Sequence, residues 1–199
     1  MSSLTPKKWD YTLEIRKVIK SGSILLSEPF MRDDVFKRSV CLICDHSKED
    51  GTFGFIINRN IKRKLHEFVD GFEGVELDVY YGGPVSNESL FYIHNNEADL
   101  EGAKKIADNL YWGGNFEQLR TLLLNNQMNT DNIQFIIGYS GWDPNQLRKE
   151  IIENSWVINN EYPLNKIFHQ DDQLWHKIMH DMGGIYSELS KYPEHPNLN

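Results

Sequence analysis

Cysteine and histidine pairs are the first candidates for chemistry in this sequence. Cys41 and Cys44 have the C-x-x-C spacing of redox pairs and zinc sites, and His46 follows two residues later. The surrounding run SVCLICD predicts a buried strand, in which residues three apart point to opposite faces. Because this geometry fits neither a disulfide nor joint ligation of a metal, we expect buried structural cysteines. His176 and His180 lie four apart without the H-E-x-x-H glutamate, which favours a surface pair, so we expect no metal or cofactor.

A serine and a double glycine lie in two glycine-rich segments. Ser140, within GYSG, resembles the G-x-S-x-G nucleophile elbow, but Trp142 stands where the second glycine belongs. Glycines that turn the chain before a capped helix explain this segment more simply, and an activated serine is the alternative. Gly82, Gly83 and Pro84 could present backbone N–H groups to an anion, but the sequence has no phosphate-loop motif. We expect a structural turn there.

Polar residues at the ends of predicted strands form a third candidate. His46 and His94 each end a strand, and with Asn58 and Gln146 they could line a cleft for binding or proton transfer. The alternative is that both histidines are half-exposed and hydrogen-bonded to turns. No pair of carboxylates has a spacing typical of general acid and base catalysis, so we predict no set of catalytic residues.

Composition and charge restrict the possible partners. The chain has 199 residues, of which 40% are hydrophobic and 25% charged, as expected for a folded protein with one core. Its net charge of -8 disfavours nucleic acid and anionic lipid, although residues 1–67 carry 13 basic and 9 acidic side chains. The cluster Arg59, Lys62, Arg63 and Lys64 is interpreted as solvated surface. With no apolar membrane segment or signal peptide and only two cysteines, we expect a cytoplasmic protein.

Hydrophobic runs and chain breakers predict the elements that position these residues. Strands are expected at 22–29, 39–45, 53–58, 77–81, 89–94, 132–139 and 156–158. The second and third form a hairpin, and the fourth and fifth pair across Gly82, Gly83 and Pro84. Helices are expected at 116–124, 164–169 and 173–182. A further helix is expected to start after Asp143, which can cap it, with Pro144 in the first helical position.

Adjacent strand pairs followed by late helices predict an α+β fold. We expect a single domain at residues 22–190, with a mixed, mostly antiparallel sheet flanked by helices and a helical C-terminal part. Residues 1–21 are an N-terminal extension and residues 191–199 a C-terminal tail in this interpretation.

A series of motifs extends from residue 22 to residue 182. They are GSILLSEP at 22–29, FKRSV at 36–40, His46, GFIIN at 54–58, YGGPV at 81–85, His94 and GYSGWDPNQLRKEI at 138–151. In this order they resemble the YqgE/AlgH family of bacterial proteins, most specifically through the last motif. The resemblance implies a cytosolic α+β domain with no established activity, catalytic residues or cofactor. Some members carry the label of transcriptional regulator, but without a helix-turn-helix pattern any such role is expected to be indirect.

Three functions follow as hypotheses, and the oligomeric state stays open. The first is a non-enzymatic binding or regulatory module that holds a protein partner or small ligand around residues 81–85 and 138–146. Its candidate binding residues are His46, Asn58, Gly82, Gly83, Pro84, His94, Ser140, Trp142 and Gln146. The second is a small hydrolase or transferase with His46 or His94 as general base, which requires both imidazoles to reach one cleft. The third, direct DNA binding through the basic cluster, is disfavoured by the charge.

Overall fold

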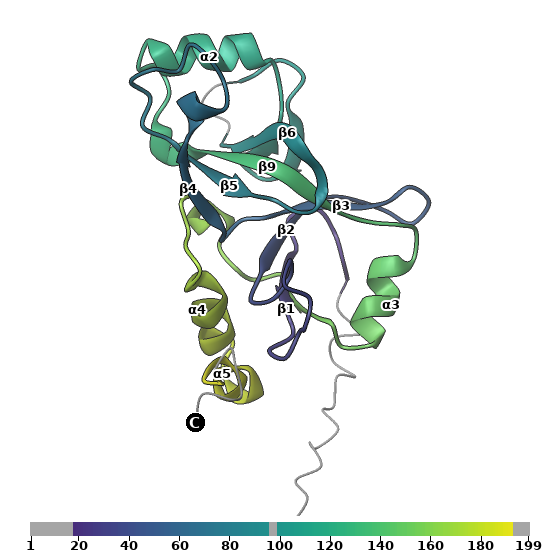
Figure 1. The fold of residues 1–199 in the computed structure, drawn as a ribbon. Helices are drawn as coiled ribbons and strands as arrows, with labels where there is room; N and C mark the ends of the chain where they lie inside the picture. The colour runs from purple at the N-terminus through teal and green to yellow at the C-terminus, as the bar shows by residue number, and fades with distance from the viewer. Residues whose placement is uncertain (1–17, 96–98, 193–199) are drawn as a thin grey trace, which may run out of the picture.

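Residues 18–95 and 99–192 are described by the computed structural model, and they form a mostly antiparallel β-sheet with helices on its faces (Figure 1). The strands are β1 (Ile24–Ser27), β2 (Val40–Ser47), β3 (Gly51–Ile56), β4 (Asn60–Lys64), β5 (Asp78–Tyr81), β6 (Val85–His94), β7 (Lys104–Ala107), β8 (Leu110–Trp112), β9 (Ile133–Trp142) and β10 (Trp156–Asn159). The helices are α2 (Phe116–Leu124), α3 (Gln146–Ile152), α4 (Leu174–Asp181) and α5 (Gly184–Ser190). Short 3-10 turns are η1 (Leu65–Glu67), η3 (Thr130–Asn132) and η4 (Leu164–Lys166). The predicted α+β class with C-terminal helices is confirmed.

Strand β9 is the centre of the sheet because it pairs with three other strands. Its C-terminal half pairs antiparallel with β3, and its N-terminal half pairs parallel with β5. Strand β6 pairs antiparallel with β9 along the opposite edge. Outward from β3 lie β2, β1 and β10, outward from β6 lie β8 and β7, and β4 pairs with β5. Two groups of strands therefore meet at β9.

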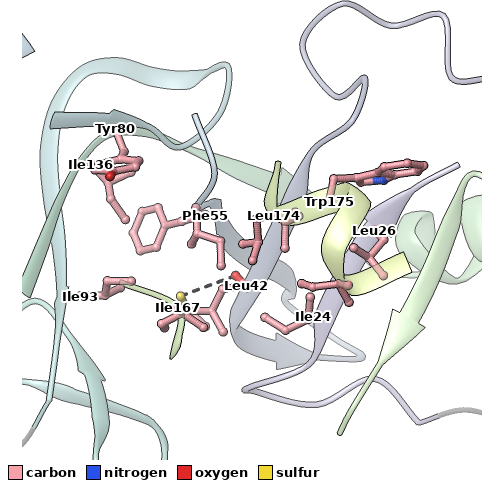
Figure 2. Packing of buried hydrophobic residues seen from close by; sticks show 14 of the residues in the cluster. Ile24, Leu26, Leu42, Phe55, Tyr80, Ile93, Ile136, Ile167, Leu174 and Trp175 are labelled. Atoms are coloured by element: carbon pink, nitrogen blue, oxygen red, sulfur yellow. Dashed lines mark hydrogen bonds between the residues drawn. The ribbon is translucent and has the colours of Figure 1, made fainter. Parts of the chain in front are cut away.

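Strands β1 and β2 are buried on both faces, which explains their uninterrupted apolar runs. Ile24 and Leu42 face the main core, where Trp175 of α4 covers the sheet, whereas Leu25 and Cys41 face a second core against α3. Figure 2 shows the main core, in which side chains from β1, β2 and β3 meet those of α4. Each of these two strands is thus fixed by packing on both sides.

A third core lies under α2, beside β5, β6 and β9. Leu119 and Leu123 of α2 pack there together with Phe135 of β9. The Asn115 side chain accepts a hydrogen bond from the Gln118 backbone N–H and caps the helix, as asparagine commonly does. Figure 1 shows α2 at one end of the molecule and α3, α4 and α5 towards the other. The predicted helix at 116–124 is confirmed.

The predicted connection between 77–81 and 89–94 is wrong in its pairing. Both strands exist, but β5 and β6 lie on opposite edges of β9 and do not pair with each other. The predicted hairpin of 39–45 with 53–58 is confirmed as β2 and β3. Residues 1–17 of the expected N-terminal extension and 193–199 of the expected tail lie outside the described residues.

Helix α3 begins two residues later than predicted. Asn145 has φ +66°, a left-handed conformation that does not continue a helix, so Pro144 precedes the helix instead of opening it. The Asp143 backbone N–H donates to Gln146 Oε1 at 2.9 Å, which stabilises the turn before α3. Leu147 and Ile151 are buried as predicted.

Other differences concern short or charged elements. The helix expected at 164–169 is only the 3-10 turn η4. Strands β4, β7 and β8 and helix α5 were not predicted, because their segments are short and carry few periodic apolar residues.

Candidate binding site

The two glycine-rich segments meet where the chain crosses β9. Gly82 follows β5, and its N–H donates to Ile137 O of β9 at 2.8 Å. Its carbonyl oxygen accepts from Ile56 N–H at 2.9 Å and from Ser140 Oγ at 3.0 Å. The chain then passes across β9 and begins β6, where Val85 pairs with Tyr139. We call residues 82–84 and 138–140 the crossing.

Glycine is required at the crossing because backbone lies directly on backbone. Gly83 has φ +147°, and a Cβ there would overlap the Tyr139 carbonyl group. Gly138 has φ +70°, and a Cβ there would overlap Gly83 O. Gly82 and Gly83 are buried and only Pro84 is exposed. These glycines therefore have a structural role, because they let the backbones of two strands come into close contact. Ser140 is fully buried beside them and donates a hydrogen bond to Gly82 O.

An open depression of about 410 Å³ lies beside the crossing. It is bounded by the end of the β2–β3 hairpin, the start of β6 and the end of β9. The lining residues are Asp45, Ser47, Asp50, Gly51, Thr52, Phe53, Val85, Tyr139, Gly141, Trp142 and Asp143. We call it the acidic depression. Its volume is in the range of small-ligand sites, about 300–1,000 Å³.

The register of three strands explains why the surface is hollow here. Asp45 pairs with Phe53, and Phe53 pairs with Gly141, so these residues form a row on one face of the sheet. Gly141 has no side chain to fill the end of that row. A Cβ at Gly141 would meet only the Tyr139 ring and the Val85 side chain, so its absence leaves space above the strand.

The acidic depression has an aromatic wall and a charged rim. The rings of Phe53 and Tyr139, both half-buried, lie 5.0 Å apart, and Phe53 also contacts Trp112 at 4.8 Å. Asp45, Asp50 and Asp143 are exposed. The lining therefore combines apolar surface with three carboxylates, a combination suited to a ligand that is partly apolar and positively charged.

A half-buried carboxylate, that of Glu150, supports the depression from behind. Glu150 Oε2 accepts from the indole N–H of Trp142 at 2.9 Å and of Trp156 at 2.8 Å. Glu150 Oε1 accepts from Gln146 Nε2 at 2.8 Å. Trp142 is only 5% exposed, and its ring packs against Trp156 and Phe36. Gln146 and Trp142 thus belong to one hydrogen-bonded network that holds α3 against the end of β9.

The predicted polar cluster of histidines, Asn58 and Gln146 is not formed. His46 pairs with Thr52 at the end of β3 that lies beside Trp142, whereas His94 pairs with Ile133 at the other end of β9. Strand β9 has ten residues, which places its two ends roughly 30 Å apart. The two imidazoles therefore do not reach one cleft, as the hydrolase hypothesis requires.

Each of these polar side chains has a local structural partner. His46 Nδ1 contacts Thr52 Oγ1 at 2.7 Å, and Thr52 lines the acidic depression. His94 is 1% exposed, with Nδ1 2.7 Å from Asn95 O and Nε2 3.0 Å from Gly113 O. The buried Asn58 amide accepts from Val40 N–H at 2.9 Å and donates to a backbone carbonyl at 3.0 Å. His46 is half-buried, as the alternative interpretation expects, whereas His94 is buried and its two ring nitrogens face backbone carbonyl oxygens.

The two cysteines are free and face different cores. Cys41 packs in the core against α3 and Cys44 in the main core, as the strand geometry predicts. Burial raises the pKa of the Cys41 thiol to about 12 and the pKa of the Cys44 thiol well above its usual range. Both thiols are therefore protonated and unreactive at neutral pH.

The histidine pair on α4 is hydrogen-bonded within the chain. His176 Nδ1 lies 2.9 Å from Ser190 O, and His180 Nδ1 lies 3.1 Å from Ser187 Oγ, so both histidines face α5. In residues 18–95 and 99–192, no group of three or more His, Cys, Asp or Glu side chains is arranged to hold a metal ion.

Three members of the basic cluster also have partners inside the chain. Arg59 donates to the backbone oxygen of Lys37 at 2.7 Å, Arg63 pairs with Glu67 at 3.0 Å, and Lys64 pairs with Asp78 at 2.7 Å. In the part of the chain that the structure describes, no helix is long and apolar enough to cross a bilayer.

Sequence reasoning missed most of the residues that line the acidic depression. Of the nine candidates, only Trp142 lines it, although Ser140 and Gly83 lie in the adjoining crossing. Asp45 and Phe53 could have been found from the hairpin register, since a pairing of these residues puts a carboxylate beside an aromatic ring. The pairing of Phe53 with Gly141 of β9 could not be predicted in this way, because Gly141 lies about 90 residues further along the chain.

The fold and the sequence both match known proteins. The crystal structure of protein DIP2367 from Corynebacterium diphtheriae superposes with a TM-score of 0.73 at 21% identity, covering 92% of this chain and 97% of that one. The solution structure of the AlgH protein from Pseudomonas aeruginosa gives a TM-score of 0.67 at 20% identity, covering 98% and 100%. At these identities the two structures show a shared fold.

Sequence relatives extend over nearly the whole chain. A UPF0301 protein of Cytophaga hutchinsonii is 37% identical over 183 residues, 92% of this chain and 100% of the relative. A UPF0301 protein of Bacteroides thetaiotaomicron is 34% identical over 191 residues, 95% of this chain and 96% of the relative. The family model described as AlgH-like matches residues 24–187. The chain therefore belongs to the AlgH-like family, as its motifs indicated.

Proposed function

We propose that this chain is a non-enzymatic binding module, built on residues 22–190, that holds a protein partner or small ligand in the acidic depression. The observation that carries the proposal is the depression itself, which lies between the two segments that the sequence selected. Val85 borders it on one side, and Tyr139, Gly141 and Trp142 border it on the other. We place the module in the cytoplasm, where its two free thiols stay reduced.

The surroundings of the reactive side chains support binding over catalysis. Ser140 is fully buried and donates to Gly82 O, and both cysteine thiols are protonated. His46 is the one predicted general base near the depression, and its Nδ1 is engaged by Thr52. Any effect on transcription would be indirect, through the bound partner, since the basic cluster serves ion pairs and backbone contacts within the chain.

Filling the depression at Gly141 tests the proposal. Gly141→Met places a long flexible side chain in the hollow, and Gly141→Ala at the same position leaves most of the space. Wild-type protein and both variants are immobilised and exposed to lysate of the native host, and bound molecules are identified by mass spectrometry. We expect a small molecule or protein held by the wild type and Gly141→Ala to be lost from Gly141→Met.

Circular dichroism and urea unfolding establish that Gly141→Met is folded before its binding is compared. Identical sets of bound molecules on wild type and folded Gly141→Met would contradict the proposal. So would a wild-type protein that retains nothing specific.

A further inference from the structure

Within residues 18–95 and 99–192, no basic side chain forms an ion pair with the carboxylates around the acidic depression. No lysine or arginine among the described residues lies within 4.0 Å of the carboxylates of Asp45, Asp50 or Asp143. Asp50 accepts a hydrogen bond from Ser47 Oγ at 3.0 Å, which orients its carboxylate at the hairpin end. Three carboxylates on one rim, in a protein of net charge -8, give this surface a negative potential that attracts cations.

The wall of the depression selects among cations. Phe53 and Tyr139 present ring surface at the base of the rim, and Val85 adds an aliphatic side chain that is 37% exposed. A hydrated metal ion gains little from contact with these apolar side chains. An alkyl stem that ends in a positive group covers the apolar surface and places its charge among the carboxylates, as lysine and arginine do.

The same aromatic array already binds one cation of this type. Lys104 Nζ lies 4.8 Å from the centre of the Trp112 ring, and Trp112 contacts Phe53 at 4.8 Å. Elsewhere in the molecule, the Arg38 guanidinium lies 4.0 Å from the centre of the Trp175 ring. Contacts between basic side chains and aromatic rings thus occur at more than one place in this structure.

We infer that the acidic depression binds an arginine or lysine side chain presented by a segment of a partner protein. This inference rests on the proposed function and specifies its ligand. Charge complementarity and the aromatic wall identify the side chain. The open shape of the depression, between a hairpin end and a strand end, allows a backbone to continue past it on both sides.

Binding of a defined peptide tests the inference. The ligand is the synthetic peptide acetyl-Gly-Ser-Arg-Gly-Arg-Ser-Gly-amide, and its control replaces both arginines with citrulline, a neutral side chain of nearly the same shape. Affinity is measured by calorimetry, and 15N-labelled wild-type protein maps the contact. We expect the arginine peptide to bind at least about tenfold tighter than the citrulline peptide, with shifts centred on Gly51 and Gly141.

Two matched triple variants separate local from overall charge. D45N/D50N/D143N removes the rim carboxylates, and D70N/E76Q/E101Q removes three exposed carboxylates elsewhere. We expect the first to weaken binding about tenfold or more and the second to leave it within about twofold. Equal weakening by both would show general attraction and overturn the inference. Shift mapping on the wild type decides the location even if a variant folds poorly.

The outcomes also distinguish this inference from the proposed function. If arginine and citrulline peptides bind equally, the cation inference fails, whereas loss of host ligands from Gly141→Met still supports a binding site. Free spermidine is titrated as a third ligand. If it binds the depression as tightly as the arginine peptide, a small cation is the ligand and the partner-segment inference is overturned.

Discussion

Gly138 and Gly141 lie three residues apart on β9 and are needed for different reasons. Gly138 has a left-handed backbone in contact with Gly83 O, so a side chain there is incompatible with the crossing. Gly141 has an ordinary strand conformation, and a Cβ there would meet only two side chains. The first glycine allows the sheet to form, and the second leaves the space that becomes the acidic depression. One motif therefore contains a fold requirement next to a candidate binding site.

The largest expected effect comes from adding a methyl group at the crossing. Gly83→Ala or Gly138→Ala combines an unfavourable φ with overlap between backbones, so each variant should lose at least about 3 kcal/mol of unfolding free energy. Urea unfolding followed by circular dichroism measures this loss. Gly141→Ala is the matched control and should change the free energy by less than about 1 kcal/mol. Equal losses at 138 and 141 would abolish the distinction between the two glycines.

A smaller effect is expected at the carboxylate that links the depression to the core. Glu150→Leu removes the acceptor of both indole N–H groups, those of Trp142 and Trp156, and should cost about 2 kcal/mol of unfolding free energy. Glu150→Gln keeps an oxygen that accepts from both indoles and should cost less. Urea titration with tryptophan fluorescence reports stability and indole environment together. If Glu150→Leu is as stable as the wild type, Trp142 is held by packing alone.

The smallest effect concerns two kinds of aspartate, one with an ion-pair partner and one without. Hydrogen bonds from Lys64 and Asn60 lower the pKa of Asp78, so its carboxylate stabilises the fold above the unfolded-state pKa of about 4. That contribution is lost as pH falls through the lowered pKa. Asp78→Asn should therefore lower the urea midpoint at pH 7, with a difference from wild type that shrinks below about pH 4.

Asp143→Asn provides the contrast, because Asp143 has no ion-pair partner among the described residues. It should leave the midpoint at pH 7 unchanged. A loss as large as that of Asp78→Asn would mean that the rim carboxylates serve the fold and not a ligand.

The sequence was most informative where a strand is buried on both faces. The runs GSILLSEP and SVCLICD have apolar residues at successive positions because neighbours on both sides exclude water, and both were predicted as strands. Strand β4, NIKRK, lies at an edge with none of its residues fully buried, and it has no such signal. Helix α5 begins with a glycine, which disfavours helix, and it forms through packing with α4.

The site was harder to predict because its parts come together through β9. Gly82, Gly83 and Pro84 look like a hairpin turn between neighbouring strands, and local rules describe them as such. The strand that separates β5 from β6 begins at Ile133, far beyond the local window. The motif residues of the crossing are hydrogen-bonded to one another across β9, whereas Phe53 and Asp45 join the depression through their pairing in the β2–β3 hairpin and the long-range pairing of Phe53 with Gly141.

The central position of β9 has a consequence for synthesis of the chain on the ribosome. The strands from β1 to β6 are made before Ile133–Trp142, so until then β3, β5 and β6 lack the partner that joins them. At about 5–20 residues per second, this interval lasts several seconds, during which apolar strand edges are open to other chains. The fold is closed only when β10 pairs with β1, over 100 residues away in sequence. Slow folding and a need for protection of the nascent chain are expected from this topology.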